Sequence, residues 1–319
     1  MKRVIYFDFW QAATEWYRLY PLDYINNPGL TIVRSTEQNV TWQLLDGFDT
    51  IVLSRPSHPL TLAIIKLAKQ LHKQVIADFD DNVLIVDQFN PMYGHYVEAK
   101  KDIIDCLILC DEVWVTTAAI KQAFRLYNNN IHVIPNAHND YIFPVSQKRK
   151  FTANKIATYR GGHSHLGDIY ELGTPEKIIS MVNNNPDWEF RFFGQRFEYL
   201  EKRCGDNYIA YSGNSDTEAF HRMMHDNNAS VFFYPLANTP FNRSKSNCSW
   251  LEASYAGSAF FGNKDLPEFD KECIFSFDDY IVKVGDETME KLNKLSWELI
   301  CDTLLVSKVN LVREERLLA

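Results

Sequence analysis

Short apolar runs alternate with longer amphipathic segments along the first half of the chain. The runs are rich in β-branched and aromatic residues and end at polar or turn residues, which predicts strands. These predicted strands cover residues 3–9, 31–35, 49–54, 74–79, 112–117 and 131–136. Between them, residues 61–73 and 96–110 have the apolar spacing of helices. Strands that are apolar on both faces and separated by helices favour a parallel, doubly wound α/β sheet.

The alternation starts again in the second half. The predicted strands there cover residues 154–162, 189–194, 208–212, 229–235 and 258–262. The stretch 139–154 is polar and contains a proline, as linkers do. We therefore predict two Rossmann-like domains, residues 1–138 and 154–319, with a linker at 139–153 and a last helix that can pack back on the first domain. Ligands of such sheets bind at the carboxyl ends of the strands, so two facing sheets would enclose a cleft.

Composition narrows the class of protein. Apolar residues make up 46% of the chain and charged residues 23%, an ordinary globular mixture, and no apolar run approaches the roughly 20 residues that span a bilayer. The first residues, MKRVIYFDFW, are interrupted by Asp8 and lead to no small-residue cleavage site, which favours a buried strand over a signal peptide. The six cysteines form no CxxC pair and no zinc spacing. We predict a cytoplasmic protein with free thiols.

The net charge of −8 is unevenly spread. Residues 1–150 hold 15 Lys and Arg against 16 Asp and Glu, and residues 151–319 hold 18 against 25. A nucleic-acid binder usually has a basic surface, so the acidic total charge argues against a DNA partner. The nearly neutral first half leaves DNA binding possible.

The stretch FNRSKSNCSWLEASYAG, residues 241–257, holds the most specific chemistry. We predict a helix that begins near Ser244, where Arg243, Lys245 and Ser246 would meet a phosphate together with the first helical N–H groups. Glu252 lies eight residues after Ser244, roughly 12 Å along a helix, which suits hydrogen bonds to a ribose. The alternative is a surface helix with an ordinary first turn and a solvated glutamate.

A longer stretch, YPLANTPFNRSKSNCSWLEASYAGSAFFG at 234–262, resembles the donor-domain signature of GT-B glycosyltransferases close to glycosyltransferase family 4. Three other stretches are similar to elements of the same family, the last of them to compact bacterial and phage members. They are VIPNA at 133–137, YRGGHSHLGDI at 159–169 and TEWYRLYPL at 14–22. The resemblance implies a GT-B fold with an N-terminal acceptor domain and a C-terminal donor domain.

The resemblance also implies roles for single residues. Arg243 and Lys245 would hold the donor diphosphate and Glu252 the ribose. The turn at 159–169 would lie beside the sugar and phosphates, with Arg160, Gly161, Gly162 and His165. The family usually has a second glutamate eight residues before the first, where this chain has Ser244. Thr239 in TPFN resembles its shifted counterpart, so the contact with the donor sugar is left open.

The acceptor side is expected in the first domain. The predicted strand 74–79 ends in a cluster of Asp78, Asp80 and Asp81, where carboxylates can hold a metal, orient a hydroxyl or act as a general base. Relatives of the GT-B type need no metal for the donor, so we place Asp80 and Asp81 in the acceptor pocket; the alternative is a helix cap and a solvated loop. His95 and Arg18 are further candidates for the cleft.

His221 and His225 have the i, i+4 spacing of a two-ligand zinc face. No third ligand is evident in the sequence, so we predict a solvated helix face there and no metal.

The predicted function is transfer of a sugar from a nucleotide-diphosphate sugar (UDP-, GDP- or dTDP-linked) to an acceptor hydroxyl, without a permanently bound cofactor or a required metal. The resemblance implies a retaining reaction; an inverting one would need a base such as Asp80 or Asp81. The acceptor is a glycan, a lipid-linked glycan or a hydroxymethylated base in phage DNA. The alternatives are a nucleotide-sugar 2-epimerase of the same fold and an inactive sugar-nucleotide binding module.

Overall fold

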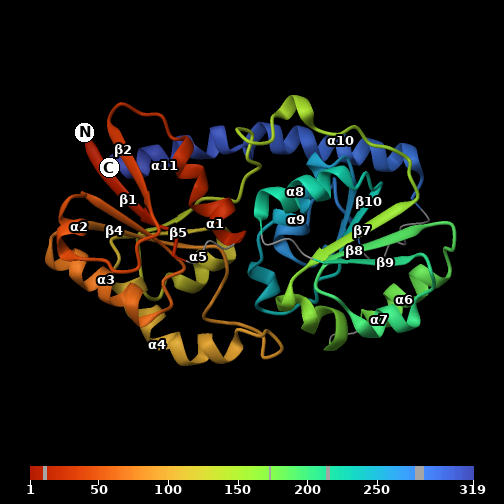
Figure 1. Cartoon of the computed structure of the whole chain (residues 1–319), viewed down its shortest axis with the longest axis horizontal. Coiled ribbons are helices and arrows are strands. Elements are labelled where there is room, and N and C mark those ends of the chain that lie inside the picture. Colours follow the sequence, from red (N-terminus) through yellow and green to blue (C-terminus); the bar gives the residue numbers. More distant parts are fainter. Residues whose placement is uncertain (10–12, 172–173, 213–215, 277–283) are drawn as a thin grey trace.

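The computed structural model describes residues 1–9, 13–171, 174–212, 216–276 and 284–319. Two α/β halves lie side by side, and in the described residues each contains a six-stranded parallel sheet (Figure 1). The N-terminal sheet has the order β2-β1-β3-β4-β5-β6. Its strands are β1 (Lys2–Phe7), β2 (Leu30–Ser35), β3 (Thr50–Ser54), β4 (Gln74–Phe79), β5 (Glu112–Val115) and β6 (Ile131–Val133). Its helices are α1 (Ala13–Arg18), α2 (Trp42–Asp46), α3 (Pro59–Gln70), α4 (Tyr93–Leu109) and α5 (Ala118–Phe124).

The C-terminal sheet has the order β12-β11-β10-β7-β8-β9. Its strands are β7 (Ile156–Gly161), β8 (Glu189–Gly194), β9 (Tyr208–Ser212), β10 (Val231–Tyr234), β11 (Ala259–Gly262) and β12 (Phe275–Ser276). The helices of this half are α6 (Pro175–Asn183), α7 (Glu198–Arg203), α8 (Thr217–Asp226), α9 (Cys248–Tyr255) and α10 (Asp286–Thr303). The predicted parallel, doubly wound α/β architecture is confirmed, and only the two-residue β12 was not predicted.

The central strands form because their sequences can be buried on both faces. All residues of β3, β5, β10 and β11 are buried, so helices on either side of each sheet exclude water from the strands. The polar residues that follow such strands emerge at the edge of the sheet, which is where the site residues lie.

The last helix, α11 (Val306–Leu318), returns to the N-terminal half (Figure 1). Its Val306, Val309 and Leu317 share an apolar cluster with Val4 and Tyr6 of β1. Together with the segment between β6 and β7, this crossing ties the two halves together.

In each sheet the chain adds strands outward in both directions from one point, the switch point. It lies between β1 and β3 in the first half and between β7 and β10 in the second. In doubly wound sheets ligands bind outside the carboxyl ends of the strands at such a switch point. We therefore expect the ligand-binding residues to follow β1, β3, β7 and β10.

Gly257 ends α9 in a conformation that other residues rarely adopt. Its φ is +83°, and a Cβ there would lie 2.7 Å from the carbonyl oxygen of Lys150. We expect Gly257→Ala to lower the free energy of unfolding by about 1–3 kcal/mol, measured by urea denaturation. The matched control is Gly94→Ala in α4, where a Cβ meets nothing within 4 Å. The control should be neutral or slightly stabilising, and equal losses in both variants would contradict the expectation.

Among the residues that the structure describes, no helix combines the length and the apolar character needed to cross a membrane.

Candidate functional site

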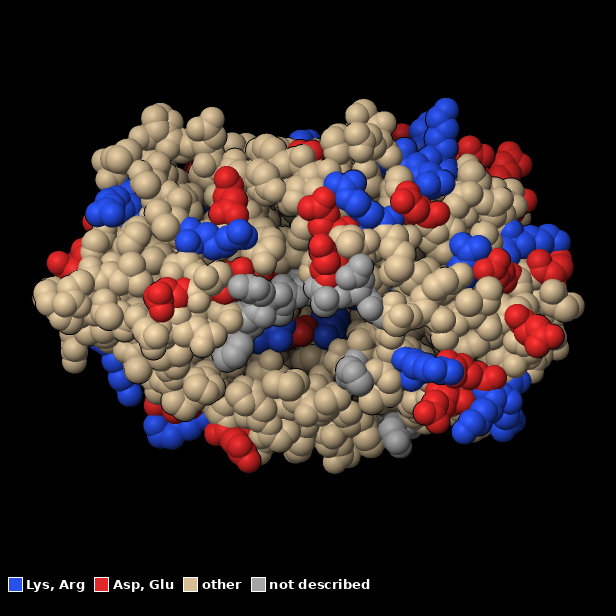
Figure 2. All heavy atoms as spheres, viewed as in Figure 1, with Lys and Arg blue, Asp and Glu red and all other residues tan. Residues whose placement is uncertain are grey.

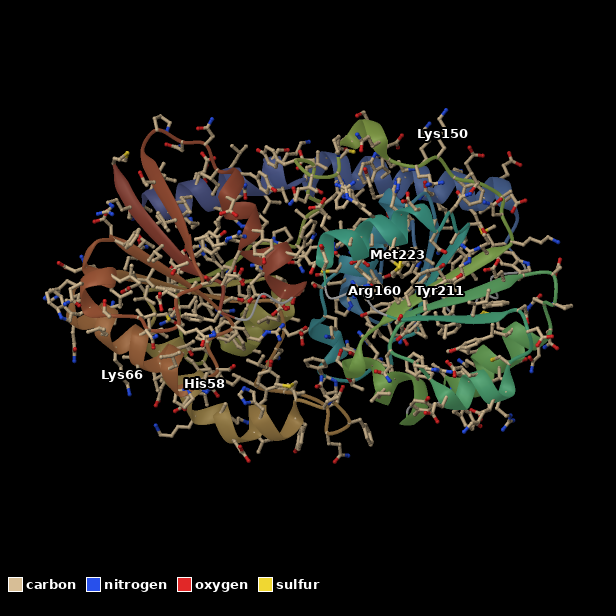
Figure 3. All side chains as sticks on the ribbon, in the orientation of Figure 1. His58, Lys66, Lys150, Arg160, Tyr211 and Met223 are labelled. Carbon is tan, nitrogen blue, oxygen red and sulfur yellow. The ribbon has the colours of Figure 1, made fainter. Side chains whose placement is uncertain are left out.

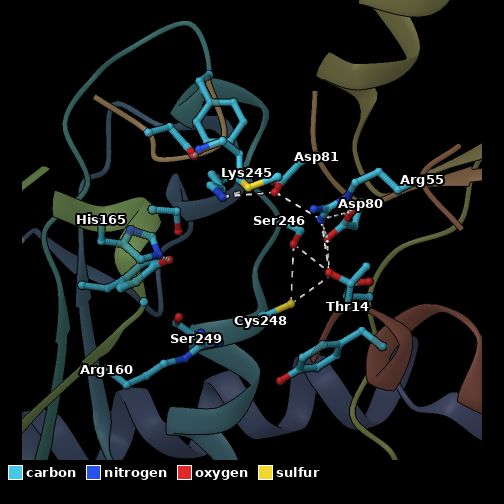
Figure 4. Close-up of a pocket in the computed structure, with 18 of the residues that line it drawn as sticks. Thr14, Arg55, Asp80, Asp81, Arg160, His165, Lys245, Ser246, Cys248 and Ser249 are labelled. Carbon is cyan, nitrogen blue, oxygen red and sulfur yellow. Dashed lines mark hydrogen bonds and ion pairs between the residues drawn. The ribbon is translucent and has the colours of Figure 1, made fainter. Parts of the chain in front are cut away.

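A cavity of about 350 Å³, here called the cleft cavity, lies between the two halves where both switch points meet (Figure 4). Figure 2 shows a hollow at the centre of the molecular surface, and Lys or Arg side chains are visible inside it. The N-terminal half contributes Thr14, Tyr17, Arg55, Asp80, Asp81 and Tyr96, among others. The C-terminal half contributes Arg160, Gly162, His165, His221, Tyr234, Lys245, Ser246, Ser249 and Glu252, among others.

Lys245 is the predicted phosphate ligand that reaches the cleft cavity. Its Nζ lies 3.2 Å from Oδ1 of Asp81, which belongs to the opposite half, and 4.5 Å from the centre of the Phe241 ring. The ammonium group is thus held by a carboxylate and an aromatic face, a position from which it can answer an incoming diphosphate. Ser246 lies beside it and accepts a hydrogen bond of 2.9 Å from Nδ2 of Asn136.

The predicted helix start near Ser244 is wrong. A single 3-10 turn occupies Asn242–Ser244, and α9 begins only at Cys248. Ser244 is buried, and its Oγ donates to the carbonyl of Phe241 at 2.8 Å. Arg243 is exposed, and its Nη1 donates to Oδ1 of Asn238 at 3.0 Å. The segment turns these two side chains away from the cavity and leaves Lys245 and Ser246 on it.

Glu252 lies one turn into α9 and is buried, not solvated. Arg160, at the end of β7, donates to both carboxylate oxygens at 2.7 Å each. Tyr17 of the N-terminal half donates to Oε1 at 2.5 Å. Burial opposes ionisation, but Arg160, His221 and the Tyr17 hydroxyl together outweigh it and hold the pKa of Glu252 below its usual value. A charged carboxylate that is fixed by two side chains still has a lone pair to offer to a ribose hydroxyl.

His221 belongs to the same site, which corrects the prediction of a solvated helix face. Its side chain is 12% exposed, its ring stacks on Trp16 at 5.1 Å, and Nε2 lies 3.3 Å from the Tyr17 hydroxyl. Burial lowers the pKa of His221 to about 4, so the ring is neutral at pH 7. Tyr17 is one of two aromatic residues directly before Arg18, and this pair was the only sequence feature that could have indicated it. Nothing in the sequence indicated that Tyr17 contacts Glu252 and His221.

Asp80 is bound by Arg55, a residue that the sequence analysis missed. Arg55 follows β3 directly, and its Nε and Nη2 donate to the two oxygens of Asp80 at 2.8 and 2.5 Å. Burial works to raise the pKa of Asp80, but Arg55, together with the charges of Lys245 and Arg18, outweighs burial and holds this pKa below its usual value. Arg55 has a φ of +40°, a strained conformation for a residue with a side chain and one that is common at functional sites.

The turn after β7 brings Gly162 and His165 to the cavity. Nδ1 of His165 lies 3.2 Å from Oδ2 of Asp168, and Nε2 lies 3.0 Å from the Tyr234 hydroxyl. Because a carboxylate can only accept, Nδ1 carries the proton, and burial lowers the pKa of His165 so that Nε2 accepts from Tyr234. Gly161 is needed for close packing, since a Cβ there would lie 2.2 Å from the Tyr159 hydroxyl.

Two candidates of the acceptor side lie elsewhere. Arg18 does not reach the cleft: its side chain is 0% exposed and its Nε donates to Oδ1 of Asp78 at 2.7 Å. His95 lines a neighbouring cavity in the N-terminal half, with Nε2 at 3.5 Å from Oγ of Ser57. Thr239 donates to Oδ2 of Asp87 across the cleft at 2.7 Å.

The carboxylates at the end of β4 and just after it form ion pairs with cations of the protein itself. Asp78 pairs with Arg18, Asp80 with Arg55, and Asp81 with Lys245. Within the described residues there is no group of three or more His, Cys, Asp or Glu side chains that could hold a metal ion.

No protein-family model and no curated protein matches the chain. Solved structures do match it. An alpha-glucosyltransferase in complex with UDP and a 13-mer DNA containing an HMU base has a TM-score of 0.66 at 10% identity, with 99% of each chain covered. Anabaena Alr3699/HepE in complex with UDP has a TM-score of 0.60 at 10% identity, again with 99% of each chain covered.

Two further solved structures match the chain with lower TM-scores. TarM has a TM-score of 0.57 at 12% identity over 84% of this chain, which spans about half (54%) of the length of TarM. A putative UDP-N-acetylglucosamine 2-epimerase from Listeria monocytogenes has a TM-score of 0.52 at 12% identity over 92% of this chain and 90% of its own. At these identities the likeness is one of fold, and it confirms the predicted GT-B architecture.

Proposed function

We propose that this chain, which has the GT-B fold of glycosyltransferases, transfers a sugar from a nucleotide-diphosphate sugar to an acceptor hydroxyl. The observation that carries the proposal is the convergence of Lys245, Arg160 and Glu252 on one cavity between the two switch points. This cavity offers a cation for a diphosphate and a fixed carboxylate for a ribose. Two of the solved structures of the same fold are named as complexes with UDP, which makes a uridine nucleotide the first donor to test.

The charges of the site suit the bond that breaks. Departure of a nucleotide diphosphate places negative charge on its oxygens, and Lys245 is positioned to stabilise that charge. Fixed cations of this kind contribute on the order of 3 kcal/mol each to transition-state stabilisation. In a retaining reaction the departing phosphate itself accepts the proton of the acceptor; in an inverting one a carboxylate such as Asp80 or Asp81 would act as the base. We propose the retaining course, with a glycan, a lipid-linked glycan or a hydroxymethylated DNA base as acceptor.

A nucleotide-sugar 2-epimerase is the second candidate, because a protein named as such shares the fold. Incubating the chain with a nucleotide sugar alone separates the two functions. An epimerase converts the donor to its epimer without any acceptor, whereas a transferase leaves the sugar configuration intact.

The donor site is tested by Lys245→Ala. We expect the Kd for UDP to rise about 10- to 100-fold, while the Kd for uridine stays unchanged, because the lysine answers the phosphate charge. Isothermal titration calorimetry measures both. The matched control is Lys101→Ala on the exposed face of α4, whose side chain is 83% exposed and paired with Asp105. Equal losses for UDP and uridine, or no binding of UDP to the wild type, would overturn the assignment.

A further inference from the structure

Tyr17 brings a hydroxyl from the N-terminal half to the predicted ribose ligand of the C-terminal half. It belongs to α1, lines the cleft cavity and donates to Oε1 of Glu252 at 2.5 Å. Arg160 reaches the same carboxylate from β7, and in Figure 3 it lies nearer the N-terminal half than Tyr211 does. The carboxylate is thus held by side chains of both halves, at the place where a nucleotide is expected to bind.

The hydrogen bonds to Glu252 leave little of its carboxylate for a ligand. A carboxylate offers about four acceptor positions, two on each oxygen. Nη2 of Arg160 and the hydroxyl of Tyr17 take the two positions on Oε1, and Nε of Arg160 takes one on Oε2. Among the residues that the structure describes, no other group forms a hydrogen bond to this carboxylate. One acceptor position, on Oε2, is therefore left for a ribose.

The Tyr17 hydroxyl is fixed as a donor to Glu252. Because a carboxylate can only accept, the phenol proton points to Oε1. Burial and the charge of Glu252 raise the pKa of Tyr17 well above its usual value, so this proton stays in place at neutral pH. Nε2 of His221 lies 3.3 Å from the Tyr17 oxygen and is its donor, and the His221 ring stacks on Trp16. A ribose hydroxyl could replace Tyr17 only by breaking this network of hydrogen bonds and stacked rings.

We propose that Tyr17 is a specificity-determining residue, which limits Glu252 to a single ribose hydroxyl. This inference rests on the proposed transferase function and narrows its donor. A carboxylate with both oxygens open can accept from the 2′- and the 3′-hydroxyl at once, whereas the position left here accepts from one of them. A nucleotide donor whose sugar lacks the other hydroxyl should then bind as well as the ribonucleotide does.

Three ligands that differ by one hydroxyl test this inference. They are UDP, 2′-deoxy-UDP and 3′-deoxy-UDP, and isothermal titration calorimetry on the full chain measures their Kd values. We expect one deoxy analogue to bind within about twofold of UDP. The other should bind about 10- to 100-fold more weakly, because it has lost a hydrogen bond to a charged acceptor. The tolerated analogue shows which hydroxyl Glu252 does not bind.

Tyr17→Phe keeps the ring and removes only the donor. It frees the second position on Oε1, so the analogue that the wild type tolerates should now bind at least about fivefold more weakly than UDP. A general loss of structure would weaken all three ligands alike and would not change their ranking. The matched control is Tyr199→Phe in α7, which removes an exposed hydroxyl that donates to another glutamate, Glu176, at 3.0 Å. This control should keep the wild-type ranking.

The outcomes separate this inference from the proposed function. If UDP does not bind the wild type, the proposed function fails. If UDP binds but both deoxy analogues lose affinity alike, the ribose displaces Tyr17 and the inference is wrong. If neither analogue loses affinity, Glu252 does not bind the ribose and the inference is wrong as well. An unchanged ranking in folded Tyr17→Phe would likewise overturn it.

Discussion

Arg18→Met is expected to lower the free energy of unfolding by about 3–5 kcal/mol, because it leaves the buried carboxylate of Asp78 without its ion-pair partner. Both side chains are 0% exposed. Arg18 also donates to the carbonyl of Ile134 at 2.6 Å and to Asn136 at 3.2 Å, and the substitution leaves these acceptors unpaired as well. Urea denaturation of the variant and of the wild type measures the difference.

The matched control is Arg34→Met. Arg34 also pairs with an aspartate, Asp23, but the two side chains are 45% and 39% exposed, and exposed pairs contribute about 0–1 kcal/mol. The folded fraction of Arg18→Met should still bind UDP like the wild type, since Arg18 does not line the cleft cavity. A similar small loss in both variants would contradict the structural role, and a selective loss of UDP affinity would return Arg18 to the site.

The central strands could be predicted from the sequence because they are apolar on both faces. The runs 49–54, 74–79 and 229–235 contain β3, β4 and β10. Such runs are recognisable because burial selects the same residue types wherever the strand lies in the sheet. β12 consists of two half-buried residues and has no such pattern.

The site could be predicted only in part. Lys245, Glu252, Asp80 and Asp81 stand after predicted strands or in a recognisable motif, and the structure brings them to one cavity. The charged and polar partners of these residues could not be predicted, because they come from distant parts of the sequence. Tyr17 meets Glu252 over 235 positions and Arg160 meets it over 92, and no local pattern indicates such contacts. Nothing in the local sequence distinguishes Arg18 from Arg55, yet Arg18 is buried in the core and Arg55 lines the cleft cavity.

Asp80 and Asp81 are neighbours in sequence, but only Asp81 forms an ion pair across the cleft. Asp80 is bound to Arg55 of its own half, whereas Asp81 lies against Lys245 of the opposite half. If Lys245 binds the donor diphosphate as proposed, the carboxylate of Asp81 would compete with that diphosphate for the lysine. The sequence places both aspartates in the predicted acceptor pocket and does not indicate the contact between Asp81 and Lys245.

The two aspartates should accordingly respond differently to the same change. Asp81→Asn removes the charge that competes with the diphosphate, and we expect the Kd for UDP to fall about three- to tenfold, the modest size reflecting a pair still reached by water. Asp80→Asn should leave the Kd for UDP unchanged and reduce turnover about 100-fold or more, because it removes a candidate base or orienting group and releases Arg55. Calorimetry with UDP measures the Kd of both variants, and a transfer assay measures their turnover. The control is Asp111→Asn, the residue directly before β5. If Asp81→Asn instead weakens UDP binding, Asp81 is a part of the donor site and not its competitor. If Asp80→Asn turns over normally, Asp80 only holds Arg55 in place, and the group that orients the acceptor is to be sought at His95 in the neighbouring cavity of the N-terminal half.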